Sequence, residues 1–151
     1  MPSYAKDPRH IKLTAVLVPL LRRTCPEGGG GFGGSYELRL SAEEVDELGG
    51  LDLIRSAMRK AARELGWTKV QTYGSSGGPV TVAGVTDERE IPEPYASVVH
   101  QSNMDRQREA MAAVSRALQD GKTRAAPNSV YLKTQEFRAA LAEAGEGRLR
   151  P

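Results

Sequence analysis

Positively charged side chains cluster in the middle of the chain at spacings that could bind phosphates. Arg55, Arg59 and Arg63 follow one another at intervals of four residues, and Lys60 lies beside them. On a helix, residues four apart lie along one line with a rise of about 6 Å, comparable with the spacing of phosphates along one DNA strand. Lys69 could extend this surface. The pattern favours salt-sensitive, weakly specific nucleic-acid binding, although a solvated outer helix face would give the same sequence.

These cations require a helix over residues 52–65, and the apolar residues predict one. Asp52 is expected to be its N-cap, because the carboxylate can accept from a backbone amide of the first turn. Gly66 is expected to end it in a left-handed conformation. The face that would be buried, with spacings of four, three and four, consists of Ile54, Met58, Ala61 and Leu65. The cations then lie on the opposite, exposed face.

A hairpin should follow this helix. The repeat changes to two over Trp67–Tyr73, and Pro79–Val85 is short, apolar and β-branched. The glycine- and serine-rich segment 74–78 predicts the turn that joins the two strands. The preceding helix can bury its apolar face on this hairpin. We therefore expect Trp67 and Tyr73 in the core and not as stacking platforms for single-stranded nucleic acid.

Residue types that carry enzyme chemistry are present without a recognised arrangement. Cys25, His10 and His100 are the one cysteine and the two histidines, and their spacing supplies neither a thiol–histidine pair nor a set of zinc ligands. A divalent cation for hydrolysis could be held by the carboxylates of Asp87, Glu88, Glu90 and Glu93. A charged segment with two prolines is also typical of a surface connection. We predict a non-enzymatic protein without metal or cofactor, with a metal-dependent hydrolase as an alternative.

The glycine-rich segment 28–34 fits a phosphate-binding loop only in part. Gly28, Gly33 and Ser35 occupy three positions of the G-x-x-x-x-G-K-[ST] pattern, but Gly34 stands where the lysine is required. Without that cation, the phosphates of a nucleotide lose their charge partner. We expect a mobile loop between two strands instead, because glycine has little side chain to pack and much backbone freedom.

Residues 10–18 alternate at first and then become wholly apolar, which favours a strand that enters the core. This strand would pair across the glycine loop with a second strand at Tyr36–Leu40. The alternative is a helix over residues 8–21, capped by Asp7 with Pro8 in its first turn. Pro19 and the frequent β-branched residues argue against that helix.

Capping and periodicity signals predict three more helices. Ser41–Glu44 forms a capping box that opens a short helix. Ser102 is expected to cap the second, and Thr134 to cap the third, which Gly145 would end; residues Lys122–Pro127 would link them. One side of the second helix carries Met104, Met111, Val114 and Leu118.

The last two helices carry many small residues, which would let other helices approach closely in the monomer or across a homodimer. These residues are Ala110, Ala112, Ala113, Ala117, Ala139, Ala140, Ala142 and Ala144. A second functional hypothesis follows: a protein-interaction or assembly module that docks a partner through these helices, or through the acidic segment at residues 43–47.

Composition places few limits on function. Lysine and arginine total 21 against 19 acidic residues in 151, so the net charge is +2 and does not by itself specify a partner. One cysteine cannot form an intramolecular disulfide, which fits a reducing compartment. The apolar run near residue 13 is too short to span a membrane. We expect a soluble cytoplasmic protein that does not act at a membrane.

The elements together predict an α+β fold. We expect a mainly antiparallel sheet of about four strands, arranged as two hairpins, with three to four helices packed on one face. Residues 10–145 should form one domain, with flexible ends at residues 1–9 and 146–151.

Overall fold

The computed structural model describes residues 4–121 and 129–149, and side chains are described up to residue 144. The predicted linker Lys122–Pro127 lies outside the described residues. Within them, the α+β class and the antiparallel sheet are confirmed, with five helices where three or four were predicted and three strands where four were predicted. The elements are α1 (Pro8–Arg23), β1 (Ser35–Leu40), α2 (Ala42–Leu48), α3 (Leu51–Glu64), β2 (Val70–Ser75), β3 (Thr81–Asp87), α4 (Tyr95–Gln119) and α5 (Ser129–Leu149).

The sheet has the order β1-β3-β2, and both pairings are antiparallel. The predicted hairpin is therefore present as β2 and β3. β1 does not pair with a strand from residues 10–18 but with β3, where Tyr36 lies opposite Val85 and Leu38 opposite Ala83. These four side chains are buried. They form the sheet face that the helices cover.

The predicted strand at residues 10–18 is wrong, because this segment belongs to α1. The alternative, a helix capped by Asp7, is the one observed. The Asp7 side chain accepts from the Arg9 amide, and Pro8 occupies the first turn. Pro19 does lie inside the helix, on its exposed side together with Ala15. The Ala15 carbonyl that Pro19 leaves without its helical donor can therefore face solvent. The buried residues recur with helical spacing: Leu13, Val16, Leu17, Leu20 and Leu21.

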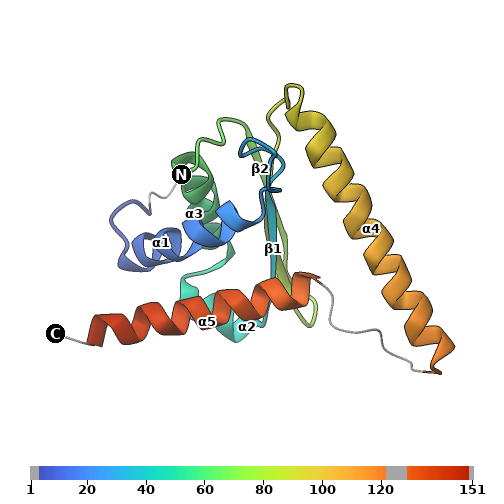
Figure 1. Ribbon diagram of the computed structural model, residues 1–151. Coiled ribbons are helices and arrows are strands. Elements are labelled where there is room, and N and C mark those ends of the chain that lie inside the picture. Colours follow the sequence, from blue (N-terminus) through green and yellow to red (C-terminus); the bar gives the residue numbers. More distant parts are fainter. Residues whose placement is uncertain (1–3, 122–128, 150–151) are drawn as a thin grey trace.

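The core lies between the sheet and the helices α1 and α3, which are on one side of it (Figure 1). α3 contributes Ile54, Met58 and Ala61, as the sequence predicted, and these residues are fully buried. Trp67 is also buried, as predicted. Tyr73 is 37% exposed, so its predicted place in the core is wrong. Its hydroxyl instead donates to Glu37 Oε1 across the sheet.

The helix ends follow the predicted chemistry in part. Ser41 and Glu44 form the capping box of α2. α3 begins at Leu51 and not at Asp52, because the Gly50 carbonyl already accepts from the Ile54 amide; Asp52 lies in the first turn. Gly66 follows α3 with φ +84°, the predicted left-handed conformation.

The last two helices begin earlier than predicted. α4 starts at Tyr95, directly after Pro94, and Ser102 lies within it. α5 starts at Ser129 and continues past Gly145 and Gly147 to Leu149, since each helical glycine costs only about 1 kcal/mol. Thr134 is consequently not a cap. Its hydroxyl accepts from the Arg39 amide, which satisfies a donor on the free edge of β1.

Candidate functional site

α4 projects from the body of the protein on the side of the sheet opposite to α1 and α3 (Figure 1). It has 25 residues, a length of about 37 Å at the ordinary helical rise. Val99 is its one buried residue. A helix of this length normally owes its stability to an apolar face covered by other elements. Within the described residues, most of α4 lacks such cover.

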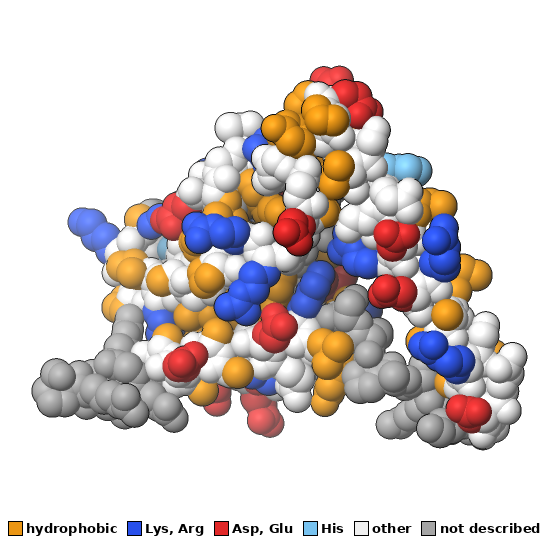
Figure 2. Space-filling view, in the orientation of Figure 1, with side chains coloured by type: hydrophobic (Ala, Val, Ile, Leu, Met, Phe, Trp, Pro, Cys, Tyr) orange, Lys and Arg blue, Asp and Glu red, His pale blue; other side chains and the backbone are white. Residues whose placement is uncertain are grey.

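Four large apolar side chains of α4 are exposed along one line, and we call them the α4 stripe. Their spacings of seven, three and four residues are those of neighbouring positions on one helix face. The exposed fractions are 42% for Met104, 73% for Met111, 49% for Val114 and 71% for Leu118. Figure 2 shows hydrophobic side chains at the surface along this helix. A contiguous exposed apolar face marks an interaction site.

The first turns of α4 are held by the glycine-rich loop. A Cβ added to Gly33 would lie 2.6 Å from a methyl carbon of Val99, and one added to Gly29 would lie 3.2 Å from another. The rings of Phe32 and Tyr95 stack at a centroid distance of 5.9 Å. Only glycine permits this close approach. The loop therefore packs against the first turns of α4, and we call this contact the seat of α4. The predicted mobility of the loop stays a prediction.

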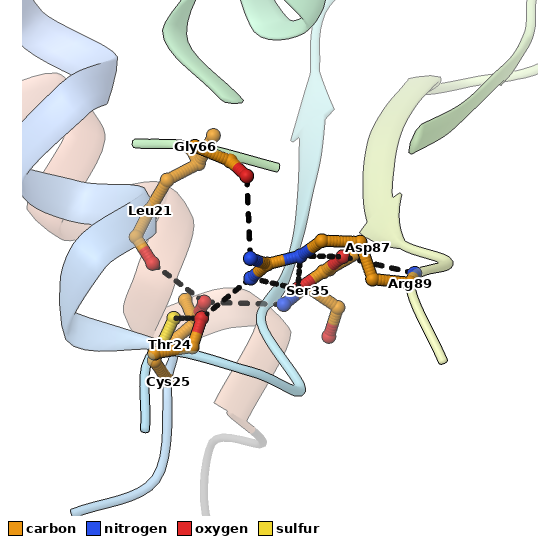
Figure 3. Close-up of polar contacts among 8 residues, drawn as sticks. Leu21, Thr24, Cys25, Ser35, Gly66, Asp87 and Arg89 are labelled. Carbon is orange, nitrogen blue, oxygen red and sulfur yellow. Dashed lines mark hydrogen bonds and ion pairs between the residues drawn. The ribbon is translucent and has the colours of Figure 1, made fainter. Parts of the chain in front are cut away.

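A buried ion pair fixes this loop to the sheet (Figure 3). The Arg89 guanidinium binds the Asp87 carboxylate at 2.7 Å, and the Asp87 side chain is 1% exposed. Arg89 also donates to the carbonyls of Gly31 and Gly66, and its guanidinium lies 4.4 Å from the centre of the Phe32 ring. The pair thus joins the end of β3, the glycine loop and the end of α3.

The same contacts limit the metal hypothesis. Asp87 is enclosed by Arg89, so its oxygens are occupied, while Glu88 and Glu90 are exposed. In the part of the chain that the structure describes, no group of three histidine, cysteine or carboxylate side chains could hold a metal ion. Burial and the Asp87 charge raise the pKa of the Cys25 thiol, which disfavours the nucleophilic thiolate.

The predicted basic face of α3 divides into two groups. Arg55 and Arg59 are half-buried and both donate to the Thr72 hydroxyl, Arg59 Nη1 at 2.9 Å. Arg55 also donates to the Thr72 carbonyl at 3.2 Å. These two arginines join α3 to β2. Their role in the described contacts is to hold the hairpin on the helix.

The other predicted cations are open to solvent. Lys60, Arg63 and Lys69 are exposed. Among the described residues, none of the five predicted cations is ion paired with a carboxylate, because all the ion pairs there involve other residues. Of the five predicted cations, all of which are described, three are exposed to solvent and two are half-buried against the hairpin.

The two histidines lie apart from each other and from the thiol. His10 is buried in α1, with Nε2 3.0 Å from the Ser56 hydroxyl and Nδ1 without a hydrogen-bond partner in the described structure. Burial lowers its pKa. His100 is exposed on α4. His10 therefore acts as a neutral packing residue between α1 and α3.

One cavity, of about 360 Å³, lies between the end of α1, α4 and α5, and Arg23, Arg106 and Lys133 are among the residues that line it. Burial and the nearby Arg106 charge lower the pKa of Lys133. Glu27 and Glu136 line the same cavity, so three cations face two carboxylates. This mixed charge selects neither an anionic nor a cationic ligand.

A second cavity, of about 450 Å³, is an apolar groove between α1 and α5. We call it the α1/α5 groove. Ile11, in this groove, is 49% exposed. The other lining residues are three alanines, Pro19, the buried Val16 and two charged side chains, and the full set is Ile11, Lys12, Ala15, Val16, Pro19, Ala140, Glu143 and Ala144.

The sequence placed the residues of the α4 stripe on one side of a helix, without indicating whether that side is covered. Met104, Met111, Val114 and Leu118 were predicted on one helix face, and they do share a face. In residues 104–119 the four residues of the stripe are the only large apolar ones, and this narrow face was the weak signal for exposure. A helix in the interior of a small domain usually has a wider apolar face.

Comparisons with protein-family models, with curated proteins and with solved structures found no match to this chain. No described helix has the length and hydropathy needed to cross a membrane. The functional argument therefore depends on the geometry of this molecule.

Proposed function

We propose that the protein is an assembly module that associates with further copies of itself through the α4 stripe. The observation that carries this proposal is the exposure of Met111 and Leu118, 73% and 71%, on a helix that projects from the body. Removing two such side chains from water is worth roughly 1.5–3 kcal/mol each. A partner surface would supply that cover.

A second copy is the favoured partner because the described residues of the chain leave two separate apolar surfaces uncovered, the α4 stripe and the α1/α5 groove. Every copy therefore brings both surfaces. The first turns of α4 pack on the glycine loop, which the Arg89–Asp87 pair joins to the sheet, and these contacts set the direction in which the helix leaves the body. A fixed helix loses little conformational entropy when it docks.

Sedimentation velocity over a wide range of protein concentration tests the proposal. The wild-type protein is expected to form oligomers as concentration rises, and the double variant Met111→Ser, Leu118→Ser to remain monomeric. Val80→Ser is the matched control, because Val80 is a 44% exposed apolar residue at the hairpin turn. A wild-type protein that stays monomeric at all concentrations, or a double variant that assembles like the wild type, would contradict the proposal.

Nucleic-acid binding is a second proposal, favoured by the exposure of Lys60, Arg63 and Lys69 without a carboxylate partner in the described structure. Three phosphate contacts predict a slope of about −2.7 in a plot of log K against log salt concentration.

A gel-shift series with duplex and single-stranded DNA at several salt concentrations measures this slope. Arg63→Glu should abolish binding, whereas Arg116→Glu, an exposed α4 position, should leave it largely unchanged. Retention that is equal in all three proteins would reject the α3 surface.

A further inference from the structure

The α1/α5 groove has the shape of a site for a helix. Its lining is apolar apart from Lys12 and Glu143, and the small side chains of Ala15, Pro19, Ala140 and Ala144 would let a third helix approach α1 and α5 closely. Large flexible side chains such as methionine and leucine fill such grooves well. We propose that the α4 stripe of one copy docks in the α1/α5 groove of a second copy. This inference rests on the proposed self-assembly and names the surface that receives α4.

The extent of the stripe argues for the groove and against pairing of α4 with α4. The stripe runs from Met104 to Leu118, two heptads or about 21 Å of helix. A coiled coil normally needs three to four heptads, and stable interfaces bury about 800 Å² on each partner. One helix against another of this length falls short of that area. A helix laid between two helices contacts both and covers more of its surface.

Each surface carries charges of both signs, Lys12 and Glu143 at the groove and Asp105 and Arg108 beside the stripe, and one pair of opposite charges can form between them. Arg108 lies on α4 between Met104 and Met111, at the side of the stripe, and its contact with Asp105 is long, 3.8 Å, and exposed. Glu143 lies at the rim of the groove on α5, exposed and without an ion-pair partner among the described side chains. Docking of the stripe can bring the Arg108 guanidinium to the Glu143 carboxylate.

The two surfaces lie on opposite sides of the molecule. α4 is on one side of the sheet, and α1 is on the other (Figure 1). The stripe therefore cannot fill the groove of its own chain in this arrangement. A contact between two different surfaces is heterologous, so the copies add head to tail and form a closed ring or an open chain.

A mixing experiment tests this pairing. The groove-blocked variant Ala15→Arg keeps an intact stripe, and Ala15 is exposed, so its substitution should leave folding unchanged by circular dichroism. The stripe-blocked variant Met111→Ser, Leu118→Ser keeps an intact groove. Each variant alone should be monomeric in sedimentation velocity, and their mixture should form a one-to-one dimer. That dimer should not grow further, because each copy has only one working surface.

The outcomes separate the inference from the proposed function. If Ala15→Arg alone forms the wild-type oligomers while the stripe-blocked variant is monomeric, α4 mediates assembly but the groove does not receive it, and the inference fails. The same conclusion follows if the mixture stays monomeric while the wild type assembles. If the wild type itself is monomeric, both proposals fail.

A charge exchange provides a second measurement that does not depend on Ala15→Arg. Arg108→Glu and Glu143→Arg should each raise the dissociation constant of the assembly, by roughly tenfold for a docked charge pair. The double variant, which carries the exchanged pair, should recover most of the wild-type affinity. Effects that simply add in the double variant would overturn the proposed contact.

Discussion

The helices α3 and α4 both have an apolar face with helical spacing, but this face is buried in α3 and exposed in α4. α3 has 14 residues, of which six are buried against α1 and the sheet. α4 has 25 residues, of which one is buried, and its large apolar side chains face outward. An apolar repeat thus shows which residues share a helix face. It does not show whether that face is covered by the same chain or by another.

The largest expected difference between the body of the protein and α4 is in the free energy of unfolding that each loses when an arginine–aspartate pair is broken. Arg89→Met leaves the Asp87 carboxylate buried without its partner, and should lower the free energy of unfolding by about 3–5 kcal/mol. Arg108→Met removes an exposed pair on α4 and should change the free energy of unfolding by less than about 0.5 kcal/mol. Urea unfolding at low protein concentration measures both values. Equal losses would contradict the distinction.

Alanine substitutions at two glycines of the same loop test whether the loop holds the start of α4. Gly33 and Gly31 both have left-handed backbones, φ +81° and +84°, so alanine should strain them equally. Only at Gly33 would the added Cβ meet Val99, at 2.6 Å, whereas nothing lies within 4 Å at Gly31. Gly33→Ala should therefore cost about 1–2 kcal/mol more than Gly31→Ala in thermal unfolding. Identical losses would show that the loop does not hold the helix.

The ion pair that joins α2 to α5 should contribute to stability at neutral pH and lose this contribution in acid. Arg138 donates to both oxygens of Glu44, and this lowers the Glu44 pKa to about 2. Because the folded pKa is below the unfolded value, the contribution to stability is present above about pH 4.5 and is lost as the pH falls toward 2. Glu44→Gln should cost about 1 kcal/mol at pH 7 and much less at pH 2.

The control for that measurement is Glu43→Gln, an exposed carboxylate in the same first turn. Urea unfolding of both variants from pH 7 to pH 2 should show the acid-dependent loss for Glu44 alone. A cost of Glu44→Gln that does not change with pH would remove the ion pair as its cause.

The smallest effect is expected at the histidines. Burial lowers the pKa of His10, so the unfolded chain binds the proton more readily and stability falls as the pH drops below about 6.5. His10→Gln should reduce this dependence between pH 7.5 and 5.5, and His100→Gln, on exposed α4, should leave it unchanged. The slope of the free energy of unfolding against pH measures this pH dependence in each protein. An equal slope in the wild type and His10→Gln would contradict the account.

Local signals predicted the elements whose chemistry is contained in a few neighbouring residues. The Ser41–Glu44 capping box, the Gly66 stop and the β2–β3 hairpin need only short-range hydrogen bonds and backbone preferences. The strand predicted in place of α1 rests on Pro19 as a helix breaker, but Pro19 lies on the exposed side of the helix. Which side of a helix is covered depends on long-range packing, which one sequence does not reveal.

The candidate site was predictable to the same degree. The residues of the α4 stripe could be placed on one face, but their exposure depends on the direction in which the chain enters α4 after Pro94 and on the contacts of its first turns with Gly29 and Gly33. Likewise, the cations of α3 were found by their spacing, whereas the use of Arg55 and Arg59 to hold Thr72 required the pairing of helix and hairpin.

Amide hydrogen exchange at increasing protein concentration tests the central claim, that the α4 stripe is exposed in one copy and covered in the assembly. We predict that amides in residues 104–118 exchange quickly at low concentration and become protected as concentration rises, while those of α3 remain protected throughout. Exchange in residues 104–118 that is fast at every concentration, or slow even in the isolated monomer, would contradict the account.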